Sequence, residues 1–249
     1  MAFPDIPTGG RVVTGVQANG TSPRTFPNLS GLTKNAGDLL IAICVAYQSS
    51  VVNSAFSAWG ASFTEFVDAG LSTTMCVGAA YKFSDGTETG TFDVTQAATI
   101  TGHACFILLS IPGAHASTPP EGGGTQTGTT SAGDANSFDP AGWGAEDTLW
   151  IAVGGNGETA TGGAFTGVTA APTNYTDYAE TGISGDVVGG VEGAVGFRQL
   201  NAASEDVGTF TVDVSNARNI IVVLAVRPAA AAPLILQPGF VNFNDPGVL

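Results

Sequence analysis

An internal repeat restricts the fold of this chain more than any other feature of its sequence. Three blocks of the first half return in the second half, in the same order and at nearly constant spacing. This spacing exceeds the period of about 20 to 50 residues found in solenoid repeats, so the sequence predicts a duplicated unit of roughly four strands in each half. The matching blocks are Asp38–Ala42 with Thr148–Ala152, Gly90–Val94 with Gly208–Val212, and Phe106–Pro112 with Val222–Pro228.

The residue pattern around these blocks is typical of β-strands. Apolar residues rarely recur at helical spacing, and short runs rich in Val, Ile, Thr and Phe are separated by Gly, Asn, Asp and Pro. Asp85-Gly86-Thr87 has the chemistry of a tight turn, which predicts a hairpin between the strands on either side. The predicted strands are Leu39–Tyr47, Met75–Phe83, Gly90–Val94, His103–Ile111, Thr148–Gly154, Gly190–Gln199, Gly208–Val214 and Ile220–Val226.

The repeat leaves two arrangements open: two small sandwiches in tandem, or two halves paired into one larger sandwich. We favour one all-β, jelly-roll-like antiparallel sandwich with extended terminal arms, because about eight strands in two sheets enclose a deeper core than four. The predicted parts are an N-terminal arm with the first strands at 1–36, the sandwich at 37–228 with repeat halves at about 37–115 and 146–228, and a C-terminal extended arm at 229–249.

Two predicted strands, Leu39–Val45 and Phe106–Leu109, are apolar on both faces. Strands of a two-layer antiparallel sandwich alternate between apolar and polar residues, so a loop, a terminal arm or a neighbouring subunit is expected to cover the second face. The apolar, proline-broken tail after Pro228 either folds back on its own sandwich or docks on a partner as an assembly arm. The residues expected to form this arm are Pro233, Leu234, Ile235, Leu236, Phe240 and Phe243.

Charge and composition disfavour several classes of function. The 249 residues include 7 Lys plus Arg and 21 Asp plus Glu, and the net charge of −14 disfavours binding to nucleic acid or to anionic membranes. The N-terminus lacks the basic and apolar regions of a secretion signal, and no apolar run reaches the roughly 18 residues of a membrane helix. We therefore expect a protein that is made in a cytoplasm and leaves it, if at all, by another route.

Residues that commonly carry chemistry are sparse. Cys44, Cys76 and Cys105 lack the spacing of zinc or CxxC sites and are expected to be buried free thiols, while a Cys44–Cys105 bridge stays open. The only histidines, His103 and His115, are too few to favour a Ser-His-Asp triad. The sequence therefore predicts no catalytic, cofactor-binding or metal-binding residue, and no enzyme activity.

Several acidic residues lie where turns are expected. We expect solvated side chains for the acids in the predicted turns near the Gly-Thr-Phe blocks, which begin at Gly90 and Gly208. These acids are Asp85, Glu88, Glu205 and Asp206. The segment Asp134–Asp139 contains possible calcium ligands but departs from the EF-hand pattern, so adventitious calcium there is left open.

Four aromatic residues form the one candidate binding site. Sugar rings stack on exposed aromatic faces, and Trp59, Trp143, Tyr175 and Tyr178 occur in Gly-rich or polar segments expected to be loops. Loop aromatics also serve as buried plugs, so these residues are candidate glycan contacts only. Trp150 lies in a predicted strand and is expected in the core.

The first half also resembles known proteins in the order of its motifs. The order of motifs is similar to that in uncharacterised structural proteins encoded by tailed bacteriophages. The segments that carry the resemblance are Gly37–Ala42, a loop with Trp59, Ala79–Phe92 and Phe106–Gly113. This resemblance implies a β-sandwich on the outside of a virion, as a capsid decoration or a head or tail appendage. It implies no active-site residue.

We therefore expect a non-enzymatic structural protein of a phage particle, which decorates or cements the capsid or forms an appendage through its sandwich faces and terminal arms. The expected partners are other virion proteins and further copies of this chain, without nucleic acid, membrane or cofactor, and the expected location is the virion. The alternative is an adhesin module that binds a host surface glycan through its loop aromatics.

Overall fold

The computed structural model describes residues 2–20, 23–47, 56–71, 75–96, 102–128, 132–157, 168–181, 191–212 and 218–230. Within these residues the chain is all-β apart from the 3-10 turn η1 (Leu29–Gly31), which confirms the predicted fold class. None of the described segments contains a helix that is long and apolar enough to cross a membrane.

The strands up to Ile111 are β1 (Arg11–Gly20), β2 (Arg24–Thr25), β3 (Leu39–Tyr47), β4 (Phe56–Trp59), β5 (Thr64–Leu71), β6 (Met75–Phe83), β7 (Asp93–Gln96) and β8 (Gly102–Ile111). The later strands are β9 (Glu121–Gly128), β10 (Ala132–Asp134), β11 (Glu146–Gly157), β12 (Val168–Ala170), β13 (Thr176–Thr181), β14 (Val191–Ala202), β15 (Thr209–Val212) and β16 (Arg218–Val226). We refer to β1–β8 as the first half and to β9–β16 as the second half.

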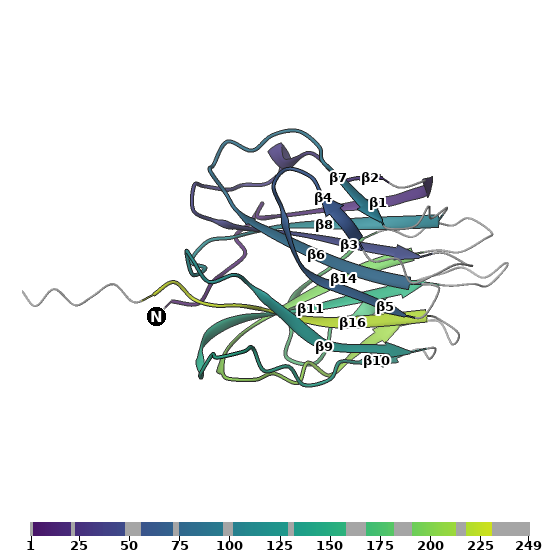
Figure 1. The fold of residues 1–249 in the computed structure, drawn as a ribbon. Helices are drawn as coiled ribbons and strands as arrows, with labels where there is room; N and C mark the ends of the chain where they lie inside the picture. Colours follow the sequence, from purple (N-terminus) through teal and green to yellow (C-terminus); the bar gives the residue numbers. More distant parts are fainter. Residues whose placement is uncertain are drawn as a thin grey trace, which may run out of the picture.

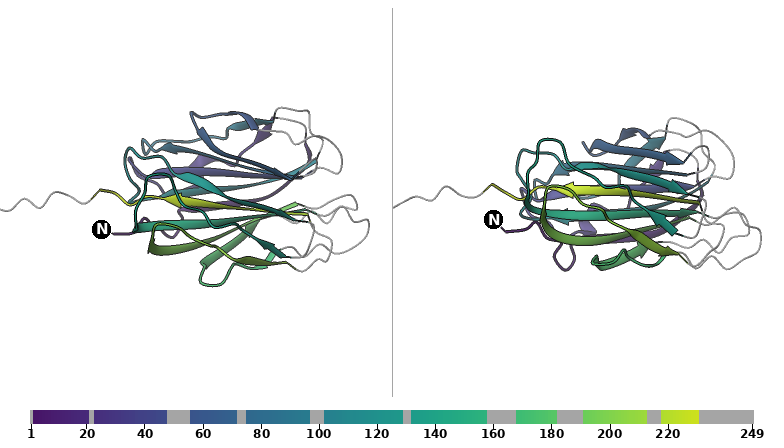
Figure 2. Two further views of the ribbon diagram at one scale, coloured as in Figure 1. Left: turned by 60° about the horizontal axis from the view of Figure 1, so that its bottom comes forward. Right: turned by 90° about the horizontal axis from the view of Figure 1, so that it is seen from below.

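These strands form two large and two small antiparallel sheets stacked as four layers. The five-stranded sheets have the orders β1-β8-β3-β6-β5 and β13-β14-β11-β16-β9, and the three-stranded sheets are β2-β7-β4 and β10-β15-β12. The two large sheets face one another at the centre, and each small sheet covers the outer face of the large sheet of its own half (Figures 1 and 2).

Three hydrophobic cores fill the spaces between the layers. The central core lies between the two large sheets and contains Ile43 and Val222. The first outer core lies between the first large sheet and β2-β7-β4 and contains Phe106. The second outer core lies between the second large sheet and β10-β15-β12 and contains Trp150, as expected for that residue.

This layering explains why β3 is apolar on both faces. Leu39, Ile41 and Ile43 belong to the central core, whereas Leu40 and Ala42 belong to the first outer core. Alternate residues of a strand point to opposite faces, so a strand between two other sheets buries every side chain. For β3, strands of the same chain thus supply the cover that the sequence predicted from a loop, an arm or a neighbouring subunit.

The two halves have the same order of strands. Adding eight to each strand number converts β1-β8-β3-β6-β5 into β9-β16-β11-β14-β13 and β2-β7-β4 into β10-β15-β12, which are the sheets of the second half. The recurring sequence blocks lie at β3 and β11, at β7 and β15, and at β8 and β16. Each half has eight strands, so the expectation of roughly four was too low.

The predicted hairpin around Asp85-Gly86-Thr87 was wrong. β6 pairs with β3 on one side and with β5 on the other, so neither of its edges is open to β7. β7 pairs instead with β2 and β4 in the small sheet. The turn is nevertheless real, because Asp85 Oδ1 accepts a hydrogen bond from the backbone N–H of Thr87 and Gly86 has a φ of 85°. It redirects the chain from one sheet to the other.

Both terminal segments lie at one end of the strands (Figure 1). The backbone N–H of Asp5 donates to the carbonyl of Pro112 at 3.3 Å, and that of Ala229 donates to the carbonyl of Gly113 at 2.8 Å. We call this surface, formed by residues 2–10, 112–115 and 227–230, the chain-end face.

Candidate functional site

The predicted glycan contact Trp59 packs against the first outer core. It lies at the end of β4, partly buried, with its ring centroid 5.7 Å from that of Phe26 and 5.5 Å from that of Phe56. Its Nε1 donates a hydrogen bond of 2.6 Å to Glu65 Oε2. The indole nitrogen is thus hydrogen-bonded within the protein, and the ring packs at a tilt against two other aromatic rings.

The other candidate aromatics belong to the second half. Trp143 is partly buried against the second outer core, with the guanidinium carbon of Arg227 5.9 Å from its ring centroid. Tyr175 is buried, and its hydroxyl donates to Glu205 Oε1 at 3.3 Å. Burial, followed by the charge of Glu205, raises the pKa of Tyr175. Tyr178 lies in β13, and its side chain is outside the described part of the structure.

The structure therefore does not bring Trp59 together with Trp143 and Tyr175. Trp59 packs on the outer core of one half and the other two on that of the other half, and both large sheets lie between these cores. The predicted arm residues 233–249 lie outside the described residues.

Two glutamates expected to be solvated are buried instead. Glu88 in the first half and Glu205 in the second are 8% and 5% exposed, whereas Asp85 and Asp206 are exposed as expected. Lys82 Nζ lies 3.2 Å from Glu88 Oε1. The Ser84 hydroxyl and the backbone N–H of Asp85 also donate to Glu88, at 2.7 and 2.9 Å.

The electrostatics of Glu88 follow from these contacts. Burial alone would raise the pKa of this carboxyl, but the hydrogen bonds from Ser84, Asp85 and Lys82 outweigh burial and lower it to about 2. Glu88 is thus held as a carboxylate at the point where the chain crosses from β6 to β7.

The second half repeats this contact at the crossing from β14 to β15. Arg198 Nη1 lies 2.6 Å from Glu205 Oε1, and the backbone of Glu205 forms a bridge with Phe138. In the sequence, Lys82 follows Tyr81 and Arg198 follows Phe197, so an aromatic residue and a cation precede the Gly-Thr-Phe block of each half. That recurrence was the sequence signal from which the two ion pairs could have been predicted. The glutamates were missed because turn chemistry alone suggests solvated acids.

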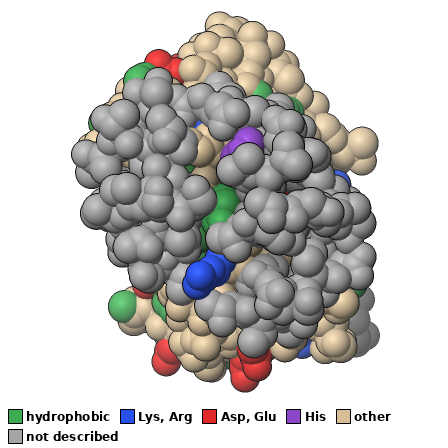
Figure 3. Space-filling view, turned by 90° about the vertical axis from the view of Figure 1, so that its right-hand side faces the viewer, with side chains coloured by type: hydrophobic (Ala, Val, Ile, Leu, Met, Phe, Trp, Pro, Cys, Tyr) green, Lys and Arg blue, Asp and Glu red, His purple; other side chains and the backbone are tan. Residues whose placement is uncertain are grey.

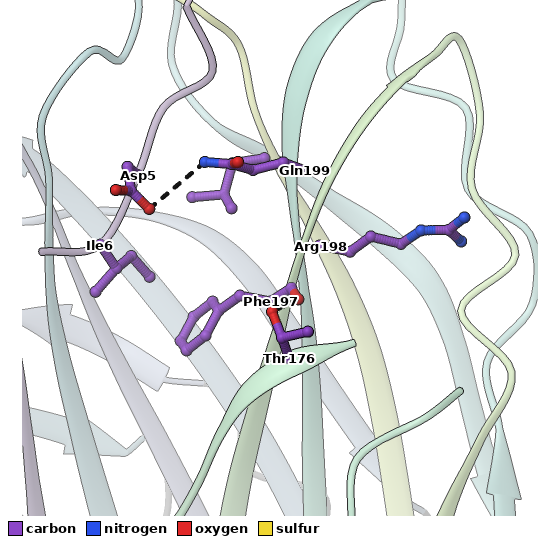
Figure 4. A pocket seen from close by; sticks show the side chains of 7 residues that line it. Asp5, Ile6, Thr176, Phe197, Arg198 and Gln199 are labelled. Carbon is purple, nitrogen blue, oxygen red and sulfur yellow. Dashed lines mark hydrogen bonds between the residues drawn. The ribbon is translucent and has the colours of Figure 1, made fainter. Parts of the chain in front are cut away.

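A small cavity lies at the chain-end face between the N-terminal segment and β14 (Figure 4). Its volume is about 110 Å³, and Asp5, Ile6, Phe197 and Gln199 are among its lining residues. Ile6 and Phe197 point toward one another, whereas Arg198 points to the other side of the strand (Figure 4). Gln199 Nε2 donates to the carbonyl of Pro4 at 3.0 Å. Small-molecule sites measure roughly 300 to 1,000 Å³, so this cavity fits a side chain better than a ligand.

The remaining candidates from the sequence have structural surroundings. Cys44, Cys76 and Cys105 are buried free thiols. Cys44 belongs to the first outer core and Cys105 to the central core, so these two side chains point to opposite faces of the sheet and no Cys44–Cys105 bridge forms. His103 is buried in β8. No group of three or more His, Cys, Asp or Glu placed to hold a metal occurs among the described residues.

The end of the sandwich opposite the chain-end face is shown in Figure 3. Hydrophobic, basic and histidine side chains of described residues are visible near its centre, and acidic side chains lie at its margin.

Comparisons of the chain with protein family models, with curated proteins and with solved structures find no match.

Proposed function

We propose that this protein is a non-enzymatic structural component of a virus particle, of the tailed-phage kind that its sequence resembles, and that it assembles through its chain-end face. The observation that carries the proposal is the joining of both terminal segments at one end of the sandwich. Residues 2–10 contact both halves there, through Pro112 in the first and Gln199 in the second. The chain continues beyond Ala230 from the same face.

Each half is, in this proposal, a jelly roll. The order β1-β8-β3-β6-β5 faces β2-β7-β4 in the first half, and β9-β16-β11-β14-β13 faces β10-β15-β12 in the second, so β5 and β13 extend the large sheets at one edge. Two opposed sheets with this alternation between early and late strands are the arrangement that jelly rolls use to bury their strands. Jelly rolls occur in viral capsid and lectin domains, an analogy of fold that supports the proposal without naming a site.

The distribution of charge supports partners other than nucleic acid. Of the 7 basic residues, Lys82, Arg198 and Arg227 are paired with glutamates and Arg24 is fully buried. Few unpaired cations thus remain for phosphate groups, and the net charge of −14 disfavours binding to nucleic acid. The proposed partners are other virion proteins and further copies of this chain.

The test is the mass of the purified protein in solution, measured by light scattering over a range of concentrations. We expect the full chain to form a defined oligomer and a chain without Pro233–Leu249 to be a folded monomer, with circular dichroism as the control for folding. A full chain that stays monomeric at every concentration would contradict self-assembly. Identical oligomers of both chains would contradict the role of the C-terminal segment.

A further inference from the structure

Cys76 and Gln96 meet between two sheets of the first half. Cys76 is the second residue of β6 in the large sheet, and Gln96 is the last residue of β7 in the small sheet that covers it. Gln96 Nε2 lies 3.3 Å from Cys76 Sγ. Both residues are almost fully buried, with 4% and 3% of their surface exposed. A thiol and a carboxamide are thus held in contact where water is largely excluded.

A buried cation accompanies this pair. Arg24 on β2 is 0% exposed, and its Nη2 donates to the carbonyl of Gly102 at 2.8 Å. Arg24 pairs in register with Val94, two residues before Gln96 on β7. Burial and the charge of Asp68 raise the pKa of Cys76 to about 12, while the hydrogen bond from Gln96 and the charge of Arg24 act in the opposite direction. The thiol therefore keeps its proton, and Arg24 supplies positive charge beside it.

We propose that Cys76 and Gln96 condense into an intramolecular thioester. The sulfur of Cys76 attacks the side-chain carbonyl carbon of Gln96, a new S–C bond forms and the C–N bond of the amide breaks. The thiol proton goes to the departing NH2 group, which leaves as ammonia. One thiol and one primary amide thus become one thioester and one ammonia, with no oxidant, reductant or other reactant.

The fold supplies what this reaction needs. Contact between two groups fixed on facing sheets replaces a bimolecular encounter, and effective concentrations in well-oriented intramolecular reactions reach about 10⁵ to 10⁸ M. The positive charge of Arg24, which acts on the Cys76 thiol, favours negative charge that develops on the sulfur. Burial then protects the thioester from hydrolysis. This inference is independent of the proposed role in a virus particle.

A thioester would give the chain a latent acyl group. Amines and hydroxyls attack thioesters readily, so separation of β6 from β7 would expose a group able to form a covalent bond with a partner. At the matching position of the second half stands Glu192 of β14, which pairs with Asn156 of β11 as Cys76 pairs with Ala46 of β3. The cysteine of the pair is therefore not repeated at that position.

The experiment is mass spectrometry of the full chain, purified without amines. We expect a mass lower than that of the sequence by one ammonia, and a cross-linked peptide that joins Cys76 to Gln96. Alkylation in denaturant should modify one fewer thiol than the 3 cysteines. Methylamine should release the Cys76 thiol and leave a methylamide on Gln96.

Variants test whether the reaction requires Cys76 and Gln96 and neither of the other cysteines. Cys76→Ala and Gln96→Leu should each abolish the loss of ammonia, whereas Cys44→Ala and Cys105→Ala should retain it, because their sulfur atoms have no carboxamide contact among the described residues. A full chain with the unmodified mass and three alkylated thiols would overturn the inference, as would a loss of ammonia that persists in Cys76→Ala.

Discussion

Replacing Glu88 by Gln removes a buried carboxylate while it preserves size and shape. The folded protein holds the pKa of Glu88 at about 2, against an ordinary value of 4.5. One pKa unit corresponds to about 1.4 kcal/mol, so the charged form of Glu88 stabilises the fold by about 2 to 3 kcal/mol at neutral pH, where the lower figure allows for screening by solvent. We expect Glu88→Gln to lower the free energy of unfolding at pH 7 by about that amount.

The dependence on pH distinguishes this effect from a packing defect. The pKa of Glu88 is lowered on folding, so its contribution is complete above pH 4.5 and is lost as the pH falls toward 2. The gap in unfolding free energy between the two proteins should therefore shrink by about 1.4 kcal/mol per pH unit in that window. Other carboxyl groups titrate in both proteins and cancel in the difference.

Urea-induced unfolding, followed by circular dichroism at several values between pH 7 and pH 3, measures this gap. The matched control is Asp206→Asn, an exposed acid in the corresponding turn of the second half, which should leave the unfolding free energy nearly unchanged. A gap between the wild type and Glu88→Gln that is equal at pH 7 and pH 3 would refute the electrostatic argument. Loss of packing would then explain the whole effect.

Two further substitutions test the packing of the first half and the buried ion pair of the second half. Gly78→Ala would place a Cβ 2.3 Å from the ring of Phe56 across the first outer core. We expect this variant to lose about 1 to 3 kcal/mol of unfolding free energy, measured by thermal unfolding. The control is Gly144→Ala, whose Cβ would have no atom within 4 Å and which should leave the stability unchanged. Arg198→Met leaves the buried Glu205 without its cation but with the hydrogen bond from Tyr175, which should cost roughly 1 to 3 kcal/mol in denaturant unfolding at pH 7. An Arg198→Met chain as stable as the wild type would show that Glu205 does not need this partner.

The sequence predicts the central strands well and the outer ones poorly. β3 and β6 begin and end at the predicted residues, because continuous apolar runs bounded by polar turns identify fully buried strands. β9 (Glu121–Gly128) was not predicted, since its sequence EGGGTQTG has no apolar alternation. It is an edge strand that forms through pairing with β16, a partner that is distant in sequence.

The surroundings of particular side chains could not be predicted from the sequence either, because they also depend on contacts between segments that are distant in the chain. The chemistry around Asp85 identifies a turn but not the sheet that receives the next strand. The burial of Glu88 and Glu205 depends on that crossing and on a cation of the preceding strand. The separation of Trp59 from Trp143 depends on the stacking of layers, which no local pattern reports.

The pairing of β1 with β8 has a consequence for the order in which the chain folds. Arg11 pairs with Leu109, so β1 has no partner until nearly the whole first half has been synthesised. The apolar face of that half then stays uncovered until β11, β14 and β16 follow. Contacts between residues so distant in sequence slow folding and leave strand edges exposed to other nascent chains. An unfinished chain of this protein therefore exposes apolar strand faces and open edges during most of its synthesis.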